Sequence, residues 1–160
     1  ALVWDLNGGL PAALQQAGLL VSSFALQWLE APARELERWG QALAAGGWLA
    51  VAVPVRGSFP QWRRAAEAAG VPCTALELPE ASELIQALSA AGLHTSLQQR
   101  LRFSRPARSG LATLRHLRDL GAGSSRTAPL SPAQLRRLLR HWPAGAPLSW
   151  DVLLLVGSKS

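Results

Sequence analysis

Hydrophobic and polar positions follow two different patterns along the chain, and the change falls near residue 92. Before it, continuous apolar runs at residues 19–26 and 48–53 are typical of strands buried on both faces of a sheet, and Pro54 is expected to end the second one. Residues 1–4 have the pattern of a strand end that leads into a turn. Apolar spacings of three and four residues predict helices at residues 32–44, 58–69 and 82–91.

The second part of the chain alternates with a period of two. Residues 93–103 place apolar and polar side chains on opposite sides, as in an antiparallel or edge strand. A basic helix is predicted at about residues 106–120. Ser131 and Gln134 form a capping box with proline at the first helical position, so another helix begins there. With a last apolar strand at residues 148–157, the order predicts an α/β protein with a mostly parallel sheet and a reversed last strand.

Composition narrows the class of protein. The chain has 160 residues, of which 49% are hydrophobic and 16% charged, as expected of one globular domain. Ser22, Ser23 and Gln27 interrupt the longest apolar run, well short of the ~18 residues of a membrane-spanning helix. A single cysteine, Cys73, fits a reducing compartment, so we expect a cytoplasmic protein. Residue 1 is alanine and methionine is absent, so we expect the natural start to lie further upstream.

The sequence contains no residue pattern typical of the active site of a hydrolase or a metalloenzyme. The three histidines are not spaced for metal binding, and no cysteine pair accompanies them. Cys73 is best explained as a small buried apolar group, and Ser58 as a helix cap. We therefore expect no metal and no catalytic nucleophile.

Polar residues at predicted strand ends have two interpretations. Asp5 follows the first strand end, and the Ser22–Ser23 pair lies inside an apolar run that leads to Trp28. Ligands of open α/β sheets bind at the carboxyl ends of strands. A buried polar pair is unfavourable unless it meets a ligand or a backbone group. Ligand binding and a local structural role both remain open for these residues.

Charge is unevenly distributed. Residues 1–92 carry five arginines and eight acids, net −3, whereas residues 93–160 carry eleven basic residues and two acids, net +9. On the helix after Ser131, three arginines lie within an arc of roughly 100° opposite the leucines. A solvated face, an acidic protein partner and nucleic acid are the three interpretations. Arginines of two helices are candidates for one basic surface: Arg115, Arg118, Arg136, Arg137 and Arg140.

Several segments resemble a known family. WDLNGGLP at residues 4–11 and VSSFALQW at residues 21–28 are similar to the second half of class I S-adenosylmethionine-dependent methyltransferases. VRGSFPQWRRA, LRHLRDLGAGSS and PLSPAQLRRLLRHW resemble the malonyl-acyl-carrier-protein O-methyltransferases of biotin synthesis. The resemblance covers nearly the whole chain and implies a Rossmann-like class I methyltransferase sheet over residues 1–160, with a helical insertion around residues 104–142.

The resemblance also implies roles for individual residues. Asp5 matches the acid that contacts the adenine amine, and the backbone of Leu6 would lie along the base. Ser22 and Ser23 match the strand end that lines the cofactor. Substrate-binding positions would be Gln27, Trp28 and Arg56, and the carrier protein would dock on Arg136, Arg137 and Arg140.

The resemblance implies an activity as well. The cofactor would be S-adenosyl-L-methionine, and the reaction would esterify the free carboxylate of a malonyl thioester on acyl carrier protein. A carboxylate is already an anion at neutral pH, so proximity and a dry pocket suffice without a general base. The first two strands of the family, together with its glycine-rich loop, have no counterpart in this chain. We therefore expect the chain alone to be inactive. A methyltransferase with another acceptor, or a non-catalytic module that binds protein or nucleic acid, are the alternatives.

Overall fold

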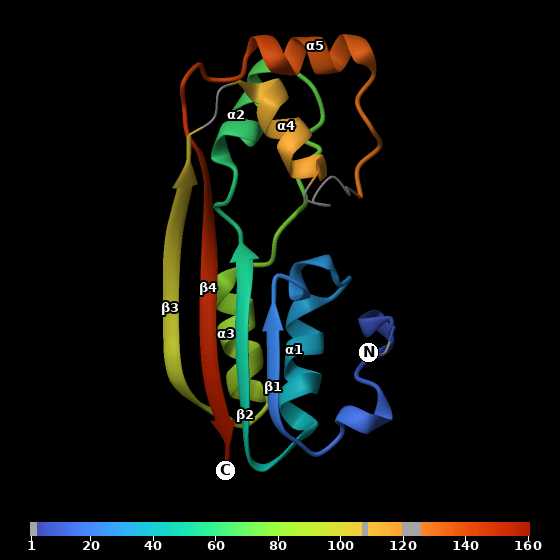
Figure 1. Cartoon of the computed structure of the whole chain (residues 1–160), viewed down its shortest axis with the longest axis vertical. Coiled ribbons are helices and arrows are strands. Elements are labelled where there is room, and N and C mark those ends of the chain that lie inside the picture. The colour runs from blue at the N-terminus through green and yellow to red at the C-terminus, as the bar shows by residue number, and fades with distance from the viewer. Residues whose placement is uncertain (1–2, 107–108, 120–125) are drawn as a thin grey trace. The chain divides into compact units, whose positions relative to one another are not determined.

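The computed structural model describes residues 3–106, 109–119 and 126–160, and the chain divides into two compact units. The first, here called the sheet unit, comprises Ala1–Arg56, Leu78–Leu101 and Asp151–Ser160. The second, the helical unit, comprises Gly57–Glu77 and Arg102–Trp150. Figure 1 shows the elements of both.

A four-stranded sheet with the order β1-β2-β4-β3 forms the first unit. β1 (Ala17–Ser23) pairs in parallel with β2 (Leu43–Val55), and β4 (Leu148–Lys159) pairs antiparallel to β2. β3 (Leu93–Arg105) is the other edge strand, and Figure 1 shows that β4 alone runs against its neighbours. The prediction of a mostly parallel sheet with a reversed last strand is confirmed.

One face of this sheet carries the core. Alternate residues of β2, including Leu49, Val51 and Val53, are buried, because side chains of a strand point to opposite faces in turn. They share one cluster with leucines of α1 (Pro32–Gln41) and α3 (Ala81–Ala90). The two helices therefore cover the same face of the sheet.

The opposite face of the strands is exposed near β1. Leu19 is 61% and Val21 69% exposed, whereas Leu20 between them is buried. The prediction that this run is buried on both faces is therefore wrong. β1 is an edge strand, and α1 and α3 cover only the face to which Leu20 points. Trp48, paired with Leu19, is likewise half-exposed.

Pro54 lies inside β2, although the sequence predicted that it would end the strand. The carbonyl of Ala52 accepts the N–H of Phe24, so Ala52 directs its backbone groups toward β1. Pro54, two residues further on, points the same way but lies beyond the last β1 pair. Its missing N–H therefore removes no bond from the sheet.

The helical unit contains α2 (Pro60–Ala69), α4 (Gly110–Asp119) and α5 (Pro132–Arg140). Apolar residues of these helices and their flanks form a second core, which includes Ala65, Leu117, Leu138 and Trp142. The predicted capping box is confirmed: Gln134 N donates to Ser131 Oγ at 3.3 Å, and Ser131 N donates to Gln134 Oε1 at 2.8 Å. Within the described segments, no helix has the length and apolarity needed to cross a bilayer.

Two predicted helix starts need correction. α4 begins at Gly110 rather than near residue 106. Ser109, directly before the helix, supplies a cap, because its Oγ accepts the N–H of Ala112 at 3.1 Å. The sequence predicts the end of that helix at Gly121–Gly123, and these residues lie outside the described part of the chain. Ser58 does not cap α2. The residue before the helix is Phe59, with left-handed backbone (φ 56°) and no side-chain cap, while Ser58 is fully buried.

Candidate functional site

Asp5 starts a short loop in which its carboxylate is already partly engaged. The residue precedes the 3-10 turn η1 (Leu6–Gly8). Its Oδ1 accepts the backbone N–H of Asn7 at 3.0 Å and the side-chain amide of Asn7 at 3.2 Å. Both bonds go to the same oxygen. The other oxygen of this exposed carboxylate has no partner within residues 3–106, 109–119 and 126–160, so it is available to a donor from a ligand.

The carboxyl end of β1 carries the two predicted serines on opposite faces. Ser22 pairs with Val51 and shares the helix-covered face with Leu20, whereas Ser23 lies on the exposed face. The next residue, Phe24, has a left-handed backbone with φ 53°, and its N–H still donates to the carbonyl of Ala52 at 2.9 Å. The strand therefore ends in a sharp turn directly after its last bond to β2.

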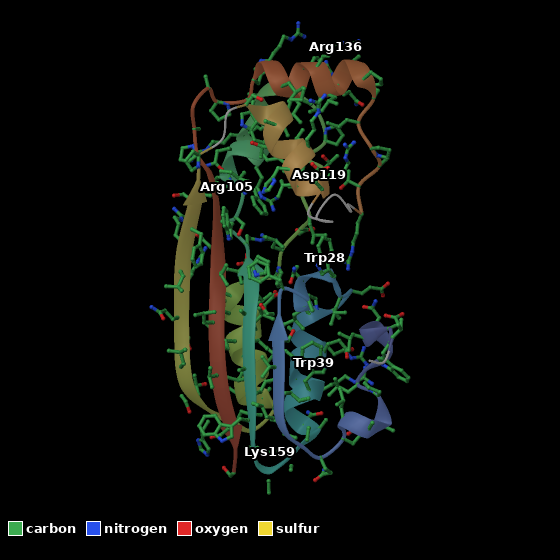
Figure 2. The ribbon with its side chains drawn as sticks, viewed as in Figure 1. Trp28, Trp39, Arg105, Asp119, Arg136 and Lys159 are labelled. Atoms are coloured by element: carbon green, nitrogen blue, oxygen red, sulfur yellow. The ribbon has the colours of Figure 1, made fainter. Side chains whose placement is uncertain are left out.

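That turn leads into the 3-10 turn η3 (Leu26–Trp28). Gln27 is buried, and its Nε2 donates to the carbonyl of Phe24 at 2.8 Å. Trp28 is 37% exposed, and Figure 2 shows it near the end of β1. The two predicted residues therefore differ in surroundings: the Gln27 amide is buried and bonds to the backbone, whereas the Trp28 indole is half-exposed.

The loop that begins at Asp5, here called the acid loop, is hydrogen-bonded to the loop that follows β1. The Oδ1 of Asn7 accepts the backbone N–H of Glu30 at 3.0 Å across 23 residues of sequence. Leu6 is partly buried and packs on the core beneath. The structure therefore brings the segment of Asp5 and Leu6 next to the segment of Gln27 and Trp28. Asn7 was not singled out from the sequence, where it looked like an ordinary turn residue.

Arg56 comes directly after β2 and belongs to a charged cluster. Its Nε pairs with Glu80 Oε1 at 3.0 Å, and its carbonyl accepts a bond from Arg100 at 2.8 Å. Arg100 also forms a 2.6 Å ion pair with Asp151, which is 2% exposed. Of this cluster, only Arg56 was expected at the site from the sequence. An acid inside the apolar final strand was the signal that could have indicated Asp151.

A depression of about 290 Å³ lies elsewhere in the sheet unit. It contains none of the predicted site residues, and Gln41 and Ala42 on its wall precede β2. It therefore lies at the amino end of β2, whereas ligands of parallel sheets bind at the carboxyl ends. Its lining consists of Gly8, Gly9, Leu10, Gln15, Arg38, Gln41 and Ala42.

The helical unit presents the predicted arginines to solvent. Arg136, Arg137 and Arg140 are exposed on α5, while Leu138 on the opposite side is buried. Arg115 and Arg118 on α4 are also exposed.

Comparison with solved structures defines the fold. A candidate methyltransferase from Bacillus halodurans C-125 aligns with a TM-score of 0.60 and 11% identity, over 96% of this chain and 74% of that protein. The YcgJ protein of Bacillus subtilis aligns with a TM-score of 0.56 and 12% identity, over 96% and 68%. The chain therefore has the class I methyltransferase fold.

Curated proteins give a narrower resemblance. The biotin biosynthesis bifunctional protein BioCD of Bordetella avium is 34% identical over 143 residues, which are 86% of this chain and 29% of that protein. A malonyl-[acyl-carrier protein] O-methyltransferase of Alcanivorax borkumensis is 29% identical over 162 aligned positions, 94% of this chain and 54% of that protein. No family model matches. Within the class I methyltransferases, the chain thus resembles enzymes of biotin synthesis, and it spans about half or less of their length.

Proposed function

We propose that this chain is part of an S-adenosylmethionine-dependent O-methyltransferase that esterifies the free carboxylate of a malonyl thioester on acyl carrier protein. The observation that carries the proposal is the 34% identity to BioCD on a class I methyltransferase fold. The Asn7–Glu30 bond supports it, because it holds the acid loop against the loop that ends β1.

The described residues suit the cofactor. Asp5 has one carboxylate oxygen without a partner in the described segments, which fits the exocyclic amine of an adenine. Leu6 is only partly buried beside it, so apolar surface is available to the base. Ser22 and Ser23 end β1 with hydroxyls that can line the remainder of the site.

When held by Asp5, Leu6, Ser22 and Ser23, S-adenosylmethionine would supply a methyl group activated by a sulfonium. Its transfer to a carboxylate oxygen would leave an ester and a neutral thioether, with no proton transferred. The protein therefore needs to align and desolvate the two groups rather than supply an acid or a base.

The resemblance assigns the acceptor side of the site to Gln27, Trp28 and Arg56; of these, Trp28 and Arg56 are exposed and can contact the substrate, whereas Gln27 is buried. Trp28 offers an exposed ring near the end of β1 that can exclude water from the reacting groups. Arg56 follows the neighbouring strand, and its pairing with Glu80 fixes the direction of the guanidinium. An arginine oriented in this way suits a substrate that arrives as a carboxylate.

An acyl carrier protein is acidic, which gives the arginines of α5 a function. Arg136, Arg137 and Arg140 form an exposed basic stripe without an acidic residue on the same helix. Opposite charges raise the association rate and orient the partner. We therefore assign carrier docking to this stripe.

The proposal is tested with the full-length gene product, S-adenosylmethionine and three acceptors. We expect release of S-adenosylhomocysteine with malonyl-carrier protein, slower release with malonyl on a small thiol, and none with acetyl-carrier protein, which lacks the carboxylate. Equal rates with acetyl- and malonyl-carrier would contradict carboxylate methylation. Tight, salt-sensitive DNA binding without methyl transfer would favour a non-catalytic nucleic-acid module instead.

A further inference from the structure

Phe24 adopts a backbone conformation that its side chain disfavours. Its φ of 53° lies in the left-handed region, which a residue with a Cβ enters only at an energetic cost. The ring is 47% exposed, so packing in the core does not hold the residue there. Strain of this kind persists only where neighbouring groups impose it, and such positions are concentrated at functional sites.

Gln27 is the side chain bonded to this turn, in addition to the backbone bond from Phe24 to Ala52. Its Nε2 donates to the Phe24 carbonyl at 2.8 Å, which ties the turn to the buried side chain three residues later. The side chain is 5% exposed, and its Oε1 has no hydrogen-bond partner among the described residues. An apolar side chain of similar size would fill the same space and remove the unpaired Oε1. What it would lose is the bond to the Phe24 carbonyl, so that bond is the reason for a glutamine at this position.

We infer that Gln27 is a positioning residue, which acts on the site through the Phe24 carbonyl rather than by touching substrate. The Gln27 amide holds the left-handed turn at Phe24 that ends β1. It thereby sets the orientation of the residues before and after this turn. Ser23 precedes the turn, and the half-exposed Trp28 follows Gln27 directly. This inference rests on the proposed function, because it takes the carboxyl end of β1 to be the reacting edge.

The test compares Gln27→Met with a matched variant, Gln41→Met, in the full-length gene product. Methionine keeps the length of the side chain but donates no hydrogen bond. We expect Gln27→Met to lower kcat for methyl transfer by about ten- to a hundredfold, because small displacements of reacting groups are costly. We expect KM for both substrates and the melting temperature to change little. Gln41, whose amide bonds to Glu37 on the surface of α1, should tolerate the change without loss of activity.

A second substitution separates positioning from contact. Glycine adopts positive φ without a Cβ penalty, so Phe24→Gly lowers the energy of the left-handed turn even when Gln27 is absent. We expect Phe24→Gly/Gln27→Met to recover a large part of the kcat that Gln27→Met loses, measured relative to Phe24→Gly alone.

The outcomes distinguish this inference from the function on which it rests. Absence of methyl transfer by the unmodified protein would overturn the proposed function. With an active unmodified protein, full activity of Gln27→Met would overturn the positioning role. A higher KM for the acceptor without rescue by glycine would show direct contact with substrate instead. A parallel fall in kcat and melting temperature would show a purely structural residue.

Discussion

Asn7 accepts the backbone N–H of Glu30 at 3.0 Å while its side-chain amide donates to Asp5 Oδ1 at 3.2 Å. One side chain therefore joins the acid loop to the loop after β1 and also orients the acid. Asn7 engages Oδ1 alone, and among the described residues the other oxygen of this exposed carboxylate has no hydrogen-bond partner. This arrangement supports the proposal, implied by the resemblance, that Asp5 binds the adenine end of the cofactor.

Replacing Asp5 by alanine in the full-length protein should weaken S-adenosylmethionine binding by about 1–3 kcal/mol, because an amine of the ligand loses its acceptor. Titration calorimetry measures the change. Asp5→Asn keeps an acceptor oxygen and should lose less. Unchanged affinity of Asp5→Ala would show that the carboxylate only caps the turn at Asn7.

Arg100 and Asp151 form an ion pair in which the acid is buried and the arginine is half-exposed. Arg100→Met leaves a charged carboxylate in the interior and should lower the free energy of unfolding by about 1–3 kcal/mol, less than for a fully buried pair. Urea denaturation of the chain measures the loss. Adding Asp151→Asn should restore part of it, because the buried side chain then carries no charge. A double variant less stable than Arg100→Met would contradict this account.

Reversing Arg136, Arg137 and Arg140 to glutamate should reduce methyl transfer to the carrier-bound substrate and spare malonyl on a small thiol. The capping box at Ser131 and the buried Leu138 are untouched, so folding should survive. The effect should fade as salt rises, because the attraction is screened.

The matched control replaces the same three arginines with lysine. That variant keeps the charge and should keep most of the activity if the attraction is electrostatic. Equal loss on both substrates in the glutamate variant would refute docking, and retained activity on both would make these arginines an ordinary solvated surface.

The chain of 160 residues should associate in solution. Leu19 and Val21 are exposed on an edge strand, which favours strand pairing between molecules. Leu19→Lys should reduce light scattering at equal concentration, whereas Leu14→Lys, at an exposed leucine outside the sheet, should not. Equal light scattering by Leu19→Lys and the unmodified chain would contradict this expectation.

Sequence patterns predicted the elements well where local rules determine them. The capping box at Ser131 and the parallel pairing of the first two long strands follow from residue type and spacing. Burial of β1 was mispredicted, because a run of apolar residues does not show whether a second layer covers both faces. Pro54 was misplaced as well, since its tolerance depends on where β1 ends.

The site was predicted as separate residues but not as a network. Trp28 could be identified from its position after a strand end, whereas Asp5 was identified from an expected strand end that the described residues 3–4 do not form. The hydrogen bond from Glu30 to Asn7 and the ion pair of Arg100 with Asp151 span long stretches of sequence, and no local pattern specifies such pairs. The left-handed turn at Phe24 also has no local signal, because neither glycine nor asparagine stands there.

The central claim is the transfer of a methyl group to the free carboxylate of a malonyl thioester, and locating that methyl group tests it most directly. The full-length gene product is incubated with malonyl-acyl carrier protein and S-adenosylmethionine that carries a deuterated methyl group, and the product is fragmented in a mass spectrometer. The account predicts the label on the carboxyl oxygen at the malonyl end, in an ester that mild base removes. A label on carbon, nitrogen or the carrier polypeptide, or no label at all, would contradict it.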